Sequence, residues 1–249
     1  MSGGAVVDVR IEAKWFRSAR GERRAVLRRI AFSARAGEVL ALLGPSGVGK
    51  STTLRIVLGL EHDFAGHVTR HAERIAAVFQ EPCLVPWLSV AGNLRLVIQQ
   101  GSQAADITPL LDEVGLPGAE THYPGELSLG MARRAALARA LVVRPDFLVL
   151  DEPFASLDPL LSATLARIVA QRARQYGTTV LIATHNVDQA VQLADRVLVL
   201  SGEPATLAFD QAVPDRADTA AIEALRRSIL LRFPFLAAEP EPPALSGNS

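Results

Sequence analysis

The chain carries the run Gly44-Pro45-Ser46-Gly47-Val48-Gly49-Lys50-Ser51-Thr52 between an apolar segment, 39–43, and the segment 53–58. This run fits the P-loop template G-x-x-x-x-G-K-[ST], and its flanks predict a buried strand before it and a helix after it. Glycines let backbone N–H groups turn inward around a phosphate chain, and the helix N-terminus adds a positive dipole end. A turn built only for tight packing would explain neither Lys50 nor Ser51. The run therefore predicts that Lys50 contacts the β- and γ-phosphates of a nucleotide and that the Ser51 hydroxyl holds Mg²⁺.

The composition limits the remaining possibilities. With 249 residues the chain can form one large domain or a core with a subdomain, and 26 basic against 26 acidic residues give no general reason to expect nucleic-acid binding. The single cysteine cannot form an internal disulfide, and no segment resembles a signal peptide or approaches the roughly 18 apolar residues of a membrane span. We therefore expect a cytoplasmic protein without a nucleic-acid partner, which would act at a membrane only peripherally, by docking onto another chain.

The N-terminal region alternates in hydropathy. Segments 6–13 and 25–34 predict an antiparallel hairpin around a polar turn. Its arginines form either a solvated tip or a contact patch for an anion; they are Arg17, Arg20, Arg23, Arg24, Arg28 and Arg29.

The central and C-terminal regions alternate between apolar strands and helices. Continuous apolar strands at 147–150, 179–183 and 196–200 predict a parallel sheet covered on both faces. We expect Asp158 to cap the long helix between the first two strands, with Pro159 at its first position and Gly177 after its end. Further strands are predicted at 66–70 and 75–79, and a short final helix at 220–231.

From 90 to 143 the periodicity of the hydrophobic residues becomes that of helices. Helices are expected near 90–100, 109–114 and 128–143, with Thr108 as the N-cap of the second and Gly115 as its stop. The fold class predicted is α/β: a P-loop NTPase with a RecA-like parallel sheet core, an N-terminal antiparallel β subdomain and an inserted helical subdomain. The domain spans 1–236 with the insertion at about 84–144, and 237–249 is a disordered tail.

Two acidic residues, Asp151 and Glu152, directly follow the apolar strand 147–150. In a parallel sheet this position lies at the same edge as the P-loop, where a nucleotide site needs a second Mg²⁺ anchor and a group that positions water. Asp151 fits the first role, through the Mg²⁺ hydration shell. Glu152, one step further on, is placed to orient or deprotonate the attacking water.

Further motifs follow in order: Gln80, Leu127-Ser128-Leu129-Gly130-Met131, Leu150-Asp151-Glu152, Ser156-Leu157-Asp158 and His185. Together with the P-loop, and over nearly the whole chain, they resemble the ATP-binding subunits of ABC transporters. Within that family the chain resembles the nitrate/sulfonate/taurine importer branch. The segments that carry this resemblance are Phe79-Gln80-Glu81-Pro82, Leu84-Val85-Pro86-Trp87-Leu88-Ser89-Val90, Asn93, Met131, Arg134 and Ala138-Arg139-Ala140-Leu141.

The resemblance implies ATP and Mg²⁺ as ligands and two cassettes that sandwich two nucleotides. It implies that Gln80 contacts Mg²⁺ or the attacking water and reports nucleotide state to the helical insertion, although a polar strand end before Pro82 would also explain it. His185 is implied to contact the γ-phosphate and to couple to Glu152. The signature residues Ser128, Leu129, Gly130 and Met131 would face the opposite subunit's ATP, and Ser128 can also be an ordinary N-cap. Ser156 and Asp158 would lie in the dimer loop.

Aromatic residues offer two further hypotheses. An adenine platform from the hairpin is expected at Phe16, with Trp15 as the second choice, since adjacent strand residues face opposite ways and the other would pack inward. Trp87 at the start of the insertion is either part of a pocket for a permease helix or a core residue.

We therefore predict the ATP-hydrolysing subunit of an importer for a small solute such as nitrate, an alkanesulfonate or taurine. Its partners would be a second copy in the ATP state, membrane permease subunits and, indirectly, an extracytoplasmic solute-binding protein. One alternative is a binding module that dimerises on ATP and hydrolyses weakly, because Leu129 replaces the first glycine of the family's Ser-Gly-Gly pattern. The other is a soluble ABC protein of DNA repair or translation, which the neutral charge and short insertion disfavour.

Overall fold

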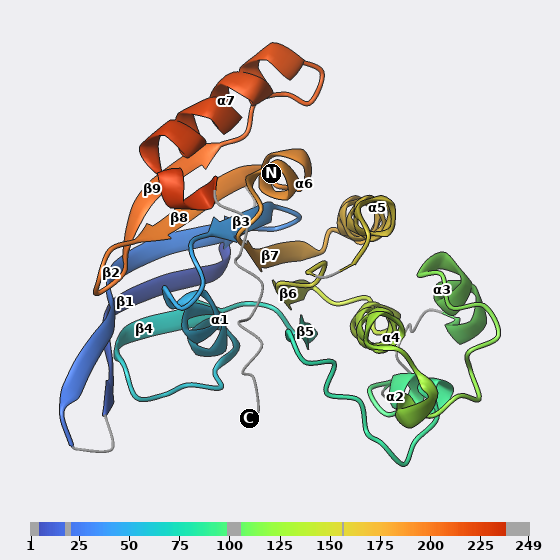
Figure 1. Cartoon of the computed structure of the whole chain (residues 1–249). Helices are drawn as coiled ribbons and strands as arrows, with labels where there is room; N and C mark the ends of the chain where they lie inside the picture. Colours follow the sequence, from blue (N-terminus) through green and yellow to red (C-terminus); the bar gives the residue numbers. More distant parts are fainter. Residues whose placement is uncertain (1–4, 18–20, 99–105, 156, 238–249) are drawn as a thin grey trace, which may run out of the picture.

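The computed structural model describes residues 5–17, 21–98, 106–155 and 157–237 (Figure 1). Its core is a six-stranded sheet of order β5-β6-β7-β3-β8-β9. The strands are β3 (Val39–Leu43), β5 (Ile75–Val78), β6 (Phe147–Asp151), β7 (Thr179–Thr184), β8 (Arg196–Ser201) and β9 (Thr206–Ala212). All pair in parallel except β9, which runs antiparallel to β8 at the edge.

The strand order places the predicted catalytic and nucleotide-binding residues at the C-terminal ends of neighbouring strands of this sheet. β3 leads into the P-loop, β6 into Glu152 and β7 into His185, and β7 pairs with both other strands. Because all three strands run the same way, their C-terminal ends meet beside one another. The prediction of a parallel sheet is confirmed; β9 was missed.

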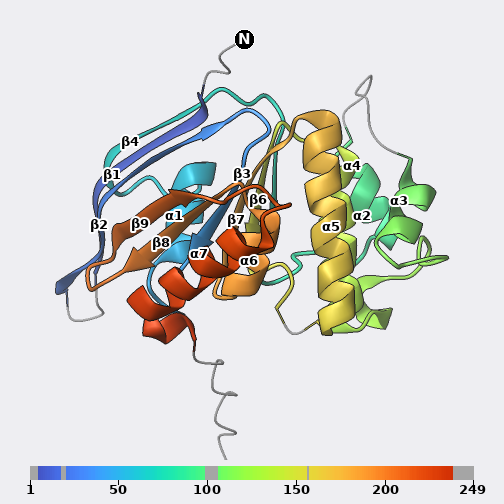
Figure 2. The same cartoon turned by 90° about the horizontal axis from the view of Figure 1, so that it is seen from above.

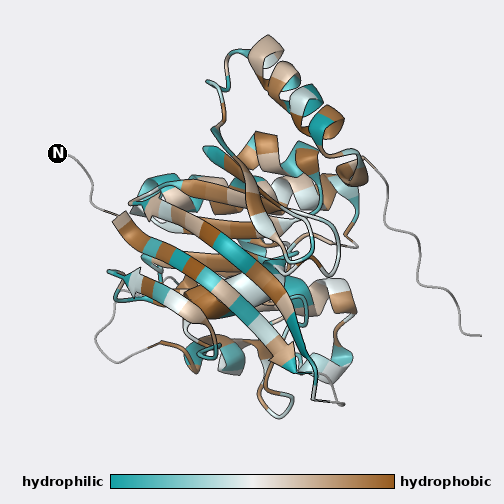
Figure 3. Ribbon diagram, turned by 90° about the vertical axis from the view of Figure 1, so that its left-hand side faces the viewer, coloured by the Kyte–Doolittle hydropathy of each residue, from teal (hydrophilic) through white to brown (hydrophobic). Residues whose placement is uncertain are grey.

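A second sheet holds three antiparallel strands in the order β2-β1-β4: β1 (Ala5–Arg17), β2 (Arg23–Arg35) and β4 (Ala65–Arg70). The predicted hairpin is thus confirmed, and its two strands are longer than the predicted segments 6–13 and 25–34. Figure 3 shows hydrophilic and hydrophobic residues alternating along these strands, as expected for a sheet with one buried face. Its buried face joins α1 (Lys50–Leu58) and one face of the parallel sheet in a single apolar cluster that includes Ile11, Ile30, Leu40, Leu54 and Phe147.

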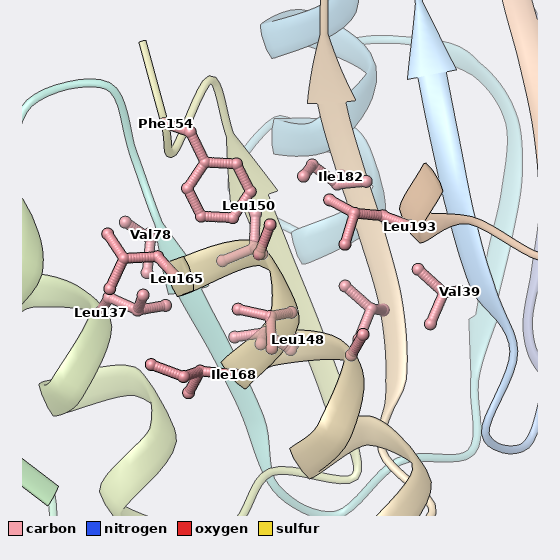
Figure 4. Packing of buried hydrophobic residues seen from close by; sticks show 14 of the residues in the cluster. Val39, Val78, Leu137, Leu148, Leu150, Phe154, Leu165, Ile168, Ile182 and Leu193 are labelled. Atoms are coloured by element: carbon pink, nitrogen blue, oxygen red, sulfur yellow. The ribbon is translucent and has the colours of Figure 1, made fainter. Parts of the chain in front are cut away.

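The helical region lies on the other side of the parallel sheet. It comprises α2 (Val90–Arg95), α3 (Ile107–Glu113), η1 (Pro124–Glu126) and α4 (Leu129–Val142), which lie beside α5 (Pro159–Tyr176) in Figure 2. Leu137 of α4, Leu165 of α5 and Leu148 of β6 belong to one buried cluster (Figure 4). The insertion therefore shares a core with the sheet that carries the predicted catalytic residues.

Two details of the helical prediction are wrong. α3 begins at Ile107 after Asp106, so Thr108 lies inside the first turn and is not the N-cap. α2 ends at Arg95, short of the expected stretch. The amides of Val97 and Ile98 donate to carbonyls three residues back and so do not continue the α-helical pattern. Gly115 does follow the end of α3, with a φ of 73°.

The C-terminal third contains α5, α6 (Val187–Leu193), α7 (Thr219–Arg232) and η2 (Pro234–Leu236). Asp158 accepts a hydrogen bond from Leu161 N, Pro159 begins α5 and Gly177 ends it, so the predicted caps are confirmed. α7 confirms the predicted final helix. The predicted tail, apart from Ala237, lies outside the described residues. Within the described ranges no helix combines the length and the apolar character needed to span a bilayer.

Candidate nucleotide site

The loop between β3 and α1 is shaped by its glycines. Gly49 precedes the first helical residue with a φ of 112°, in the left-handed region, and a Cβ at this position would lie 2.5 Å from Leu27 Cδ2. A Cβ at Gly44 would lie 2.7 Å from Val48 Cγ1. Both positions therefore need glycine, and the loop keeps its N–H groups at the N-terminus of α1, where an anion is favoured.

Lys50 is buried beneath this loop. Its Nζ donates to Gly44 O at 2.7 Å and to Pro45 O at 3.2 Å, and it lies 3.3 Å from Glu152 Oε1. The ammonium is thus held between the loop carbonyls and a carboxylate, at the place where the template predicts contact with a phosphate chain.

Asp151 ends β6 and is only 5% exposed. Burial raises the pKa of its carboxyl group, and a hydrogen bond with Ser51 opposes that rise. Its Oδ1 finds no hydrogen-bond partner within the part of the chain that the structure describes. A buried carboxylate oxygen without a partner, beside a hydroxyl, matches the oxygen ligands that Mg²⁺ prefers. Ser51 and Asp151 therefore fit the ion that the sequence predicts.

Glu152 follows in a left-handed conformation, with a φ of 47°. Its Oε2 lies 3.0 Å from Nδ1 of His185, which follows β7. Burial acts to raise the pKa of Glu152, but the hydrogen bond with His185 and the charge of Lys50 outweigh it, so the pKa is lowered. The same hydrogen bond raises the pKa of His185. Glu152 is therefore ionised at neutral pH, as a group that accepts a proton or orients water must be.

A cleft of about 1730 Å³ opens over these residues and is large enough for a nucleoside triphosphate. Gln80, after β5, lines it together with residues 45–52, Asp151, Glu152 and His185. Phe16 lines the cleft and is 44% exposed, whereas Trp15 is half-buried beneath the Arg23 guanidinium, 5.4 Å from its ring centroid. The structure thus brings the first-choice platform, Phe16, to the site.

The family described as ABC transporter matches residues 27–155. The aliphatic sulfonates import ATP-binding protein SsuB 2 of Pseudomonas syringae pv. tomato is 43% identical over 204 residues, covering 82% of this chain and 86% of the relative. The chain belongs to the ABC transporter family. SsuB 1 of Pseudomonas syringae pv. syringae is 44% identical over 203 residues, 82% of this chain and 84% of its own.

Solved structures agree with this assignment at the level of fold. A dimeric bacterial ABC transporter cassette superposes with a TM-score of 0.75 at 23% identity, covering 84% of this chain and 99% of the cassette. A dimeric cassette in a post-hydrolysis state with ADP and Pi gives the same values. The chain is accordingly an ATPase of the ABC family with a P-loop NTPase fold.

The signature of this ABC protein lies at the start of α4. The Ser128 side chain accepts a hydrogen bond from Met131 N at 3.2 Å, so the ordinary N-cap is present. Leu129 is 58% exposed, and a Cβ at Gly130 would lie 3.3 Å from Leu157 Cδ2. As far as the described residues show, none of Ser128, Leu129, Gly130 and Met131 lines the cleft. Asp158 caps α5, and Ser156 lies outside the described residues.

Trp87 is 76% exposed in the loop before α2, so its reading as a core residue of the insertion is wrong. The arginines of the hairpin are divided in their contacts. Arg23 covers Trp15, and Arg24 forms an ion pair with Glu203 at the rim of the cleft. Arg17, Arg28 and Arg29 are exposed, and Arg20 lies outside the described residues.

Sequence reasoning missed Lys14, which is 2% exposed and lies with its Nζ 4.6 Å from the Phe16 ring centroid. Alternation along β1 buries the residues at 7, 9 and 11 and would expose residue 14, but a register shift between Lys14 and Trp15 interrupts the pattern there. Sequence reasoning missed Glu203 as well, since the pairing with Arg24 joins residues 179 positions apart.

Proposed function

We propose that this ABC ATPase is the nucleotide-hydrolysing subunit of an importer for aliphatic sulfonates. The observation that carries the proposal is the Glu152 carboxylate, held ionised between His185 and Lys50 at the floor of a nucleotide-sized cleft. The names of the similar Pseudomonas proteins support an aliphatic sulfonate, the chemical class that includes taurine, over nitrate as the cargo.

In this proposal Lys50 exchanges its loop carbonyls for the β- and γ-phosphates of ATP, while residues 44–52 surround the phosphate chain with N–H groups. Ser51, Asp151 and Gln80, which all line the cleft, would hold Mg²⁺. When bound, the ion neutralises charge on the phosphates. Phe16 stacks on the adenine.

Glu152 then orients the water that attacks the γ-phosphate and accepts its proton, and His185 contacts that phosphate and fixes the carboxylate. The attacking oxygen forms the new bond to phosphorus as the bond to the β-phosphate oxygen breaks, giving ADP and phosphate. The side-chain contact between His185 and Glu152 at 3.0 Å supports this division of roles.

The ATP state is proposed to be a homodimer in which the Ser128–Met131 segment of each copy completes the other copy's site, with Asp158 and Ser156 in the dimer loop. Such head-to-tail contacts related by a two-fold axis form two equivalent sites. Residues 1–236 are proposed to act as one ABC ATPase domain, with 84–144 as its helical insertion. Permease subunits dock at this insertion, where Trp87 is exposed, and hold the protein at the inner face of the membrane; an extracytoplasmic binding protein delivers the cargo.

The test uses the subunit reconstituted with its permease and binding protein in lipid nanodiscs. Phosphate release should be stimulated by binding protein loaded with an alkanesulfonate, and less by nitrate or taurine. Stimulation by nitrate alone, or by taurine but no other alkanesulfonate, would assign that solute as the cargo instead. Hydrolysis indifferent to the permease would remove the transport role.

A further inference from the structure

Lys14 is a buried cation with fixed partners. Its Nζ donates to Asp63 O at 2.6 Å and lies 3.1 Å from Glu61 Oε1 and 3.6 Å from Asp63 Oδ2. A lysine is almost never fully buried unless it is paired, and here the pairing fixes the ammonium in one place. Both partners belong to the segment between α1, which begins at the P-loop, and β4.

The ammonium lies against one face of Phe16. Its distance to the ring centroid, 4.6 Å, is within the range of a cation–π contact. Phe16 is 44% exposed and lines the cleft, whereas Lys14 is 2% exposed and is not among the described residues that line it. The accessible part of the ring is thus the part that a base would contact.

We propose that Lys14 is a positioning residue for nucleotide binding, which holds the Phe16 ring and polarises it from behind for stacking on the adenine. This inference rests on the proposed role of Phe16 and adds a residue to it. Aromatic faces carry negative potential, so two stacked faces repel each other electrostatically. A cation behind the first ring draws that potential away and favours the stack.

The contacts of Lys14 also link the two parts of the protein that are proposed to bind the two ends of the nucleotide, namely the Phe16 ring and the P-loop. Lys14 is anchored to Glu61 and Asp63, which follow the helix whose N-terminus carries Lys50. The distance between platform and P-loop is thereby fixed before a nucleotide arrives, and a preorganised site loses less conformational entropy on binding.

The experiment compares ATP with inorganic tripolyphosphate, which has no base. Lys14→Met should weaken ATP binding by about tenfold, the upper part of the range for a shielded cation–π contact, and leave tripolyphosphate binding unchanged. Lys14→Arg should restore ATP binding because it keeps the cation. Arg74→Met, which removes an ion pair with Asp146 at the far ends of β5 and β6, is the matched control and should change neither affinity.

A double-mutant cycle with Phe16→Leu decides whether Lys14 acts through the ring. In the Phe16→Leu background, Lys14→Met should lose most of its effect on ATP affinity. Additive effects, or equal losses for ATP and tripolyphosphate, would overturn the proposal. If Phe16→Leu alone leaves ATP affinity unchanged, the platform itself is misassigned and the fault lies in the proposed function. Should Lys14→Met fail to fold, Glu61→Gln, which removes the closest carboxylate partner of the ammonium, must still weaken ATP binding selectively.

Discussion

Lys50 is the side chain whose partners must change most when ATP binds. It is held by two loop carbonyls and Glu152, and each charge-assisted hydrogen bond to a phosphate must exceed what it replaces. We expect Lys50→Ala to weaken ATP binding by roughly 10- to 100-fold and to abolish turnover, while the chain still folds with a Tm lowered by the loss of the ion pair with Glu152. Calorimetric titration and thermal unfolding measure both, with Arg74→Ala as control. Parental affinity and turnover in the variant would contradict the site assignment.

A substitution at Glu152 should distinguish ATP binding from ATP hydrolysis. Glu152→Gln keeps the size and polarity of the side chain but removes the acceptor of the proton, so ATP should bind while hydrolysis falls by on the order of 10²- to 10⁴-fold. The ATP-bound dimer should then accumulate, which light scattering after gel filtration detects. A variant that hydrolyses at the parental rate, or that stays monomeric where the parent dimerises, would place the role elsewhere.

The contact of His185 with Glu152 has a defined pH window. His185 has a pKa raised above 6.5, so its stabilising effect is complete below that value and is lost as pH rises through the folded pKa. Glu152 has a pKa lowered below 4.5, so its effect is present above 4.5 and is lost as pH falls through the folded pKa. The pair is therefore most stabilising between these values.

We accordingly expect His185→Ala to reduce the free energy of unfolding more at about pH 5.5 than at about pH 8.5. Urea unfolding in EDTA, which removes divalent ions, measures this difference. An equal loss at both pH values would mean that the imidazole stabilises the fold by packing alone.

At the level of elements, the signature at the N-terminus of α4 departs from the family pattern at one position. Leu129 is 58% exposed, so its side chain extends toward whatever approaches this helix end. At a tight phosphate interface it can misplace reacting groups, and an ångström of misplacement costs on the order of 10²-fold in rate. We expect slow basal hydrolysis and a higher rate in Leu129→Gly, with ATP affinity of the monomer unchanged. An equal or lower rate of steady-state phosphate release would show that the leucine is harmless.

The loop that presents Trp87 is organised by one buried side chain. Asn93 of α2 accepts from Val85 N and donates to the carbonyls of Val85, Leu88 and Ser89. Asn93→Leu removes the hydrogen-bond partner that the structure shows for Val85 N and for Leu88 O, whereas Val85 O still accepts from Leu88 N and Ser89 O from the backbone amide of residue 93. We therefore expect a loss of about 2 to 4 kcal/mol in the free energy of unfolding. Loosening of the loop should also lower the fluorescence anisotropy of Trp87 in a Trp15→Phe background. Unchanged stability and anisotropy would contradict this role.

Elements fixed by local signals were predictable from the sequence. The glycines, Lys50 and Ser51 define the loop before α1, and Asp158, Pro159 and Gly177 define α5. Elements defined by distant partners were not. β9 is half-exposed and lacks a continuous apolar run, so its signal comes from pairing with β8. The contact of Lys14 with Glu61 joins residues 47 positions apart, beyond the reach of any periodicity.

At the level of the whole molecule, the two sheets and the helices meet so that one chain presents two different surfaces. The P-loop, Glu152 and His185 line the cleft, while the segment beginning at Ser128 lies outside the lining residues that the structure describes. In the proposed ATP-bound homodimer a second copy supplies this segment, so dissociation of the dimer would disassemble both sites at once. The sequence could therefore predict residues of the site within one chain, but not the contacts that the proposed dimer would add, because those contacts depend on how two copies meet.

Lys50 and Glu152 also neutralise each other, 3.3 Å apart, whenever a triphosphate does not compete for the ammonium. After the terminal phosphate departs, the cation has a carboxylate already within reach, so it is never left buried and unpaired. The charges of the resting site are therefore compensated within the chain, and in the proposed cycle the phosphates of each incoming ATP must displace Glu152 from Lys50 before the carboxylate can serve as the base.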